Sequence, residues 1–160
     1  MQEDTYQTLL NASFRFLSFR PRSFKEIGDF LHKKTRKTYV APEVFKRITD
    51  RLTELGYIDD AKFTSWWIAA RQRTKPKGMR LIKQELKQKG IDIEAGVETS
   101  EDDIARRAVQ KKIEIWKKLP KPEQKKKIYD FLGRRGFTLE VIRRVVDEVA
   151  GKGYNNDEVE

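Results

Sequence analysis

Cysteine is absent from this 160-residue sequence, and histidine occurs only once, at position 32. Without cysteine the chain forms no disulfide, no thiolate metal site and no thiol nucleophile. One histidine cannot build a cluster of histidine ligands for zinc, and a Ser-His-Asp relay would depend entirely on His32. His32 follows Leu31 on the predicted exposed face of a helix, so we expect a solvent-exposed residue there with a structural role.

Long apolar runs and phosphate-binding loops are missing as well. The uncharged stretch around the tryptophans, Phe63 to Ala70, has eight residues, whereas a membrane helix needs roughly 20. No Gly-x4-Gly-Lys-Ser/Thr loop is present, and Gly151-Lys-Gly153 lacks its spacing. The first residues, Met1 to Asp4, carry acids where a secretory signal would carry bases. We expect a soluble, cytoplasmic protein that is not an enzyme and holds no metal or other cofactor.

Charged residues make up 38% of the chain, and hydrophobic residues also make up 38%, including nine Phe and three Trp. Disordered chains are poor in aromatic residues, so this composition predicts a folded protein with a thin core. Thirty-five Lys and Arg exceed 25 Asp and Glu, which leaves a net charge of +10. Such an excess favours a polyanionic or acidic partner.

Apolar residues recur at helical spacing through almost the whole chain, and no segment alternates as a strand does. Ser23-x-x-Glu26 has the pattern of a capping box, and Pro42 suits the first turn of a helix. Three glycines follow apolar helices and fit the left-handed position that ends a helix: Gly56, Gly90 and Gly136. The fold class is therefore predicted to be all-α.

An internal repeat aligns Ile27 to Lys34 with Ile82 to Lys89 and with Ile128 to Arg135. Each copy has an isoleucine, a leucine four residues later and a base three residues beyond that. We expect the three leucines to occupy equivalent buried sites: Leu31, Leu86 and Leu132. The repeat predicts three tandem three-helix modules near residues 1–58, 59–100 and 101–150, followed by a polar, disordered tail over 151–160. The segment after Gly90 has few large apolar residues, so the last helix of the second module is expected to be short or frayed.

Charge is distributed unevenly. Arg71 to Gly90 holds eight bases and one acid, Asp92 to Asp103 holds six acids and no base, and Arg106 to Lys127 holds ten bases and two acids. Bases at this density neutralise phosphates, and arginine also pairs with carboxylates on acidic proteins. The alternative interpretation is that these bases only keep the protein soluble, above all at Lys125 to Lys127. The acids could in principle bind Mg²⁺, but we expect them to be solvated or paired with nearby bases.

Trp66 and Trp67 have the chemistry to stack on nucleobases. Their helical spacing with Phe63 and Ala70 favours a position in the core instead.

Four motifs lie in order across roughly residues 14–145. They are Leu17-Ser-x-Arg20-x-x-Ser23-x-x-Glu26-Ile27-x-x-x-Leu31, then Leu52-x-x-Leu55-Gly56-Tyr57-Ile58-Asp59-Asp60-x-x-Phe63 with Arg71 after it, then Gly78-x-x-Leu81-x-x-x-Glu85-Leu86-x-x-Lys89-Gly90-Ile91, and Leu132-x-Arg134-Arg135-Gly136-Phe137-Thr138. Together they resemble the signatures of the RecX family of bacterial recombination regulators. The stretch from Asp92 to Asp103 departs from the family, since it lacks the clear apolar helix usual after the third motif.

The resemblance implies three tandem three-helix repeats in an elongated, curved body. It also implies a negative regulator of homologous recombination and DNA repair that binds the RecA–single-stranded DNA filament and inhibits its growth, ATPase and strand exchange. The implied partners are the RecA filament and single-stranded DNA, with weak binding to duplex DNA, and we expect a monomer. The candidate contact residues are Arg71, Arg73, Lys75, Lys77, Arg80, Lys83, Lys87, Lys89, Arg134 and Arg135.

Two other functions stay open on the residues alone. The first is a stand-alone helical DNA-binding protein, because three-helix units often place one helix in a duplex groove. The second is a helical adaptor for another protein. On a helix from Gly78 to Lys89, the bases form one stripe (Arg80, Lys83 and Lys87) and the apolar residues face the core (Met79, Ile82 and Leu86). We therefore expect that the stripe can be removed to test binding without disturbing the packing of the helix.

Overall fold

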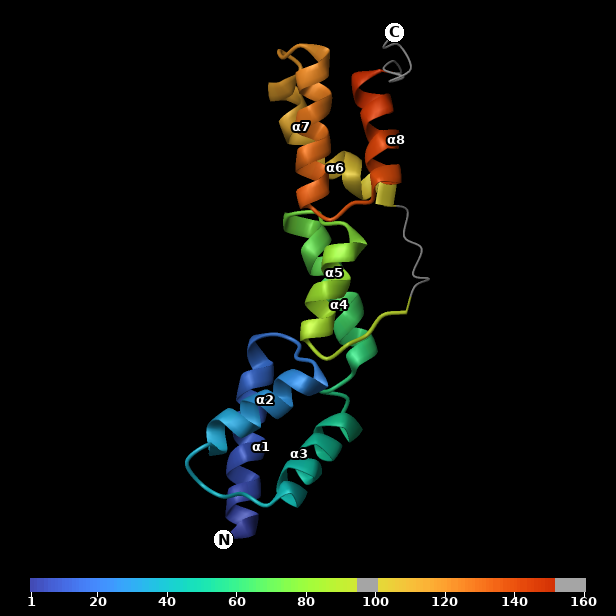
Figure 1. Cartoon of the computed structure of the whole chain (residues 1–160). Coiled ribbons are helices and arrows are strands. Elements are labelled where there is room, and N and C mark those ends of the chain that lie inside the picture. The colour runs from blue at the N-terminus through green and yellow to red at the C-terminus, as the bar shows by residue number, and fades with distance from the viewer. Residues whose placement is uncertain (95–100, 152–160) are drawn as a thin grey trace. The chain divides into compact units, whose positions relative to one another are not determined.

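Backbone geometry confirms the all-α prediction. The computed structural model describes residues 1–94 and 101–151, and over these residues the chain forms eight α-helices and no strand (Figure 1). The helices are α1 (Gln2–Phe19), α2 (Phe24–Thr35), α3 (Pro42–Glu54), α4 (Asp60–Thr74), α5 (Met79–Gln88), α6 (Glu101–Trp116), α7 (Lys121–Arg134) and α8 (Leu139–Ala150). None of the helices in the described ranges is long and apolar enough to cross a membrane.

The chain divides into two compact units. Unit 1 comprises Met1–Ile68 and Glu85–Ile93, and unit 2 comprises Ala69–Gln84 and the chain from Glu94 onward. The division passes through α4 and α5, so each of these helices contributes residues to both units.

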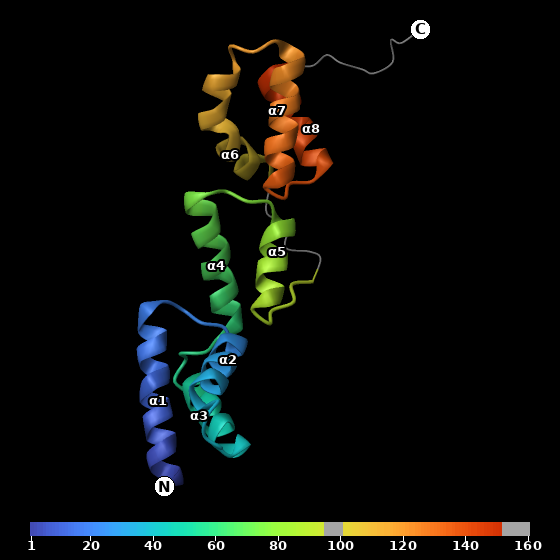
Figure 2. The ribbon, with the colours of Figure 1, turned by 60° about the vertical axis from the view of Figure 1, so that its left-hand side comes forward.

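Each unit has a core built around three mutually packed helices. In unit 1, α1, α2 and α3 bury Leu9, Leu10, Ile27, Leu31, Val44, Ile48 and Leu52, together with Ile58 from the turn after α3. In unit 2, α6, α7 and α8 lie side by side (Figure 2) and bury Ala105, Val109, Ile128, Leu132, Val141, Ile142, Val145, Val146 and Ala150, with Phe137 from the α7–α8 turn. Burial of these apolar side chains is the main favourable contribution to folding.

The three repeated leucines are buried, as predicted. Leu31 of α2 is 1% exposed, and Leu86 of α5 and Leu132 of α7 are completely buried. The isoleucines four residues earlier, at 27, 82 and 128, are also completely buried. The boundaries of the three modules remain our prediction.

Local signals begin and end the helices where the sequence indicates. Ser23 and Glu26 form the complete capping box of α2, and the Asp59 carboxylate accepts a 3.1 Å hydrogen bond from the backbone N–H of Lys62 at the start of α4. Thr138 caps α8 in the same way. The three predicted glycines have φ of +77° (Gly56), +78° (Gly90) and +85° (Gly136), the left-handed region that ends a helix without steric cost in glycine.

Two predictions fall at the edges of the described residues. Residues 91–94, where the last helix of the second module is expected to begin, are not helical, and 95–100 lie outside the described residues. The predicted tail also lies outside them, apart from Gly151.

Candidate functional site

Most of the ten predicted contact residues belong to unit 2. Eight lie there, near the end of α4, in the turn before α5, on the first half of α5 and at the end of α7: Arg71, Arg73, Lys75, Lys77, Arg80, Lys83, Arg134 and Arg135. The other two, Lys87 and Lys89, belong to unit 1.

Two basic turns of unit 2 touch each other, although they are far apart in the sequence. The backbone N–H of Gly78, just before α5, donates a 2.7 Å hydrogen bond to the backbone oxygen of Arg135 at the end of α7. The Arg135 guanidinium in turn donates to the backbone oxygen of Pro76 over 3.3 Å and lies 4.8 Å from the centre of the Phe131 ring. The structure therefore brings the bases of the α4–α5 turn together with those at the end of α7.

Glycine is required on both sides of this contact. A Cβ at Gly78 would stand 2.1 Å from the backbone oxygen of Gly136, a fixed atom that cannot yield as a flexible side chain can. A Cβ at Gly136 would stand 2.5 Å from Cγ of Leu81. The close approach of the two backbones therefore requires glycine at both positions.

Four bases on or beside these turns are exposed, and we call them the double-turn site: Arg73, Lys75, Arg80 and Arg134. The other four candidates in unit 2 are half-buried: Arg71, Lys77, Lys83 and Arg135. One carboxylate lies beside the site, because Oε1 of Glu101 accepts a 2.6 Å hydrogen bond from the backbone N–H of Met79 at the start of α5. The arrangement can present several cations to phosphates or carboxylates over a small area.

Two acids of the Asp92–Asp103 stretch are paired with nearby bases, as expected. Asp102 accepts hydrogen bonds of 2.9 and 3.0 Å from Arg144, and Asp103 pairs with Arg106. Within residues 1–94 and 101–151, no group of three or more His, Asp or Glu side chains is arranged to hold a metal ion.

The predicted two faces of α5 are confirmed. Its apolar side is buried (Met79, Ile82 and Leu86), whereas Arg80 and Lys87 are exposed and Lys83 is half-buried.

Lys89 has a role inside unit 1. Its ammonium lies 2.9 Å from Oε1 of Glu26, and its backbone oxygen accepts a 2.7 Å hydrogen bond from the Ser23 hydroxyl. Arg20 binds the same carboxylate through two hydrogen bonds of 2.6 and 3.2 Å. Burial by itself would raise the pKa of Glu26, but the hydrogen bonds from Arg20, Lys89 and the Ser23 backbone outweigh it and lower the pKa to about 2.

Aromatic residues follow the predictions in part. His32 is exposed, and Trp67 is buried in the core as expected. Trp66 is half-buried and lines a cavity with Arg20, Arg22, Tyr57 and Lys62, residues that sequence reasoning does not assign to a binding site. The sequence signals near this cavity are the first motif, around Arg20, and the second motif, from Gly56 to Phe63, and they indicate helix boundaries and the family alone.

Comparisons with known proteins agree on one family. Residues 59–95 match the second three-helix domain of RecX, and residues 100–146 match its third three-helix domain. Together these matches span slightly more than half of the chain.

Curated relatives carry the same name. The chain is 34% identical over 155 residues to the regulatory protein RecX of Bacillus subtilis, a match covering 92% of this chain and 56% of that protein. It is 27% identical over 163 residues to the regulatory protein RecX of Thermobifida fusca, covering 97% of this chain and 86% of that one. The chain thus spans little more than half the length of its Bacillus relative.

Two crystal structures of RecX proteins share the fold. The RecX of Lactobacillus salivarius aligns with a TM-score of 0.69 at 24% identity, over 92% of this chain and 97% of that chain. A second RecX structure aligns with a TM-score of 0.67 at 22% identity, over 91% and 73%. At these identities the likeness is evidence for the helical repeat fold alone.

Proposed function

Because the chain belongs to the RecX family, we propose that it is a negative regulator of homologous recombination and DNA repair. In this proposal it binds the RecA–single-stranded DNA filament and inhibits filament growth, ATPase and strand exchange. It acts by binding and carries out no catalysis, in keeping with curated relatives that are named regulatory proteins. A filament on chromosomal DNA lies in the cytoplasm, so the proposed activity is cytoplasmic.

The observation that supports this function best is the contact between the two basic turns of unit 2. The hydrogen bond from Gly78 to Arg135 joins turns that carry the exposed bases Arg73, Lys75, Arg80 and Arg134. A recombinase filament offers two kinds of group to such a site, namely DNA phosphates and carboxylates of the protein coat. Arginine binds both with paired, charge-assisted hydrogen bonds.

The ten candidate contacts are not equivalent in this proposal. The primary contacts are the four exposed bases of the double-turn site and Lys87, the other exposed base of the α5 stripe. Lys89 and Arg135 are positioning residues, because the former is held by Glu26 and the latter by Pro76 and Phe131. Arg71, Lys77 and Lys83 are half-buried and secondary.

Binding measurements with three matched probes test this function. The probes are a fluorescent single strand, the same strand coated with RecA, and a duplex of the same sequence. We expect the tightest binding to the coated strand and weak, sequence-independent binding to the duplex. Tight, sequence-selective binding to bare duplex with no preference for the filament would instead establish the stand-alone DNA-binding protein, and binding indifferent to salt would favour the adaptor.

A charge-matched pair of variants separates a site from general basicity. The first variant changes the double-turn site to alanine (Arg73, Lys75, Arg80 and Arg134). The control changes four other exposed lysines of unit 2 to alanine (Lys111, Lys112, Lys118 and Lys126). Both lose four positive charges, so only a specific site makes the first variant bind the filament more weakly, by about tenfold or more, which is about 1.4 kcal/mol.

A further inference from the structure

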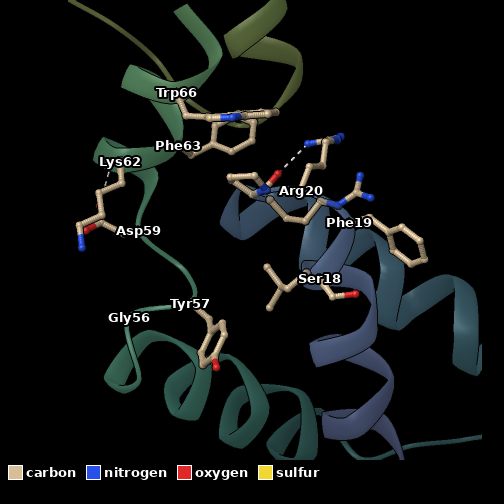
Figure 3. A pocket seen from close by; sticks show the side chains of 12 residues that line it. Ser18, Phe19, Arg20, Gly56, Tyr57, Asp59, Lys62, Phe63 and Trp66 are labelled. Carbon is tan, nitrogen blue, oxygen red and sulfur yellow. Dashed lines mark hydrogen bonds between the residues drawn. The ribbon is translucent and has the colours of Figure 1, made fainter. Parts of the chain in front are cut away.

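A cavity of about 590 Å³ opens in unit 1, next to the end of α1 (Figure 3). One wall is the chain from Leu17 to Arg22, at the end of α1 and in the loop that follows it. The other wall comes from the turn between α3 and α4 and from the first two turns of α4, between Gly56 and Trp66. No residue of the double-turn site lines this cavity.

The interior of the cavity is apolar. Leu17, Pro21, Phe63 and Trp66 line it, and Tyr57 stands at its edge with 52% of its surface exposed. Phe19, which is 79% exposed, points away from the cavity beside it (Figure 3). Exposed aromatic residues grouped around an apolar hollow are characteristic of a binding surface.

The aromatic rings of the cavity already have neighbours, which argues against a stacked nucleobase. The Arg20 guanidinium lies 5.9 Å from the centre of the Trp66 ring, and Phe63 packs against that ring at 5.8 Å. Tyr57 meets Phe14 in an edge-to-face contact at 5.0 Å. A base needs an open ring face on which to stack, whereas an apolar side chain needs only a hollow lined by carbon.

Two cations at the rim form no ion pair with a carboxylate among the described residues. The Arg22 guanidinium lies 3.8 Å over the Phe16 ring, and Lys62 is exposed on the first turn of α4. Arg20 differs, since Glu26 holds it. The single carboxylate in the lining is Asp59, which caps α4. The rim therefore presents a net positive charge around an apolar interior.

We infer that this cavity docks an acidic peptide segment of the filament protein, which inserts one apolar side chain between Leu17 and Trp66 and places its carboxylates on Arg22 and Lys62. An apolar centre surrounded by charged groups is the usual anatomy of a protein interface. The inference rests on the proposed function and adds a second contact in unit 1, separate from the double-turn site.

Photo-crosslinking identifies the occupant directly. Tyr57→benzoylphenylalanine places a photoreactive ring at the edge of the cavity, and Tyr39→benzoylphenylalanine places the same ring at an exposed position outside it. On RecA-coated single-stranded DNA, the substituted position 57 should crosslink to an acidic segment of RecA, and position 39 should crosslink far less. Crosslinking of position 57 to the DNA, or equal crosslinking of both positions, would overturn the inference.

A second charge-matched pair of variants measures how much the two rim cations contribute to filament binding. Arg22→Gln/Lys62→Gln should weaken filament binding by about fivefold, while Lys33→Gln/Lys37→Gln, an equal loss of charge at exposed positions of unit 1, should change it by less than about twofold. Thermal unfolding confirms that each variant is folded. If the wild-type chain does not bind the filament, the proposed function has failed; if it binds and the first pair behaves as the control, only the cavity inference has failed.

Discussion

The Ser23 hydroxyl donates a 2.7 Å hydrogen bond to the backbone oxygen of Lys89, and the backbone N–H of Gly78 donates an equally short one to the backbone oxygen of Arg135. The two contacts join equivalent positions of the internal repeat. Ser23 and Gly78 each stand four residues before a buried isoleucine, and Lys89 and Arg135 each stand three residues after a buried leucine. At the first contact the end of α5 meets the start of α2, and at the second the end of α7 meets the start of α5. Each of these three helices is the second helix of its predicted repeat. The side chains of the repeated base are also held at these junctions in the second and third repeats, whereas Lys34, the base of the first repeat, is exposed.

Removal of the junction hydroxyl should cost more than removal of an ordinary helix cap. Ser23 is completely buried and makes two hydrogen bonds, to the Glu26 N–H and to the Lys89 oxygen. Ser23→Ala should therefore lower the free energy of unfolding by about 2–3 kcal/mol. Thr138→Ala removes only one capping hydrogen bond of α8, the 3.4 Å bond from the Val141 N–H to the Thr138 hydroxyl. It should cost about 0.5–1 kcal/mol. Urea unfolding measures both, and equal losses would contradict the role of the junction.

A methyl group at Gly78 should be far more damaging than one at a helical glycine with open space. Gly78→Ala forces the two turns of unit 2 apart and should cost about 2–4 kcal/mol. Gly28→Ala is the matched control, because no atom lies within 4 Å of the place that the new methyl group would take on α2. That control should stabilise the chain by about 0.5–1 kcal/mol, as alanine does in a helix interior. Thermal melts compare the two, and a tolerated Gly78→Ala would show that the close contact is dispensable.

Acid should weaken unit 1 through Glu26. The pKa of this carboxyl is lowered from 4.5 to about 2 in the folded chain, so its ionised form favours folding. The contribution is complete above about pH 5 and is lost as the pH falls toward 2. Glu26→Gln should cost about 2 kcal/mol at neutral pH, after allowance for partial exposure, and the difference from wild type should shrink as the pH falls. Glu54→Gln, at an exposed ion pair with Arg51, is the control and should change stability by less than about 0.5 kcal/mol at any pH. A pH-independent loss in Glu26→Gln would contradict this account.

Local chemistry explains how much of this fold the sequence predicts. The capping box at Ser23 and Glu26 and the positive φ of Gly90 and Gly136 depend on neighbours within a few residues, so the pattern alone indicates them. Burial of Leu31, Leu86 and Leu132 follows from helical periodicity in the same way.

Long-range contacts explain what the sequence does not predict. Lys89 and Arg135 look like any other exposed base, and only the fold brings them to Glu26 and Pro76. The cavity beside Trp66 also joins two segments distant in the sequence, whereas helical spacing alone places this residue in the core. Sequence reasoning selects exposed bases such as Arg80 together with half-buried ones such as Lys89, and only the fold distinguishes the two groups.

A variant that lacks the basic stripe on α5 distinguishes binding to phosphates from binding to protein carboxylates. Arg80→Ala/Lys83→Ala/Lys87→Ala leaves the buried face of the helix intact, so the thermal midpoint should hardly change. If the stripe lies on phosphates, the slope of log K against log[salt] should flatten by roughly 2–3 units. We expect the other outcome, in which binding to bare single strands barely changes and filament inhibition weakens. A folded variant that inhibits at the wild-type dose would remove the stripe from the binding surface and direct attention to Arg134.

RecA ATPase on single-stranded DNA tests the central claim most directly. The account predicts that the rate of ATP hydrolysis falls as the wild-type protein is added and reaches a low plateau. The double-turn variant, with Arg73, Lys75, Arg80 and Arg134 changed to alanine, should need about tenfold more protein for the same inhibition, and the control that loses four lysines elsewhere in unit 2 should match wild type. An ATPase rate that stays unchanged at saturating wild-type protein would contradict the account.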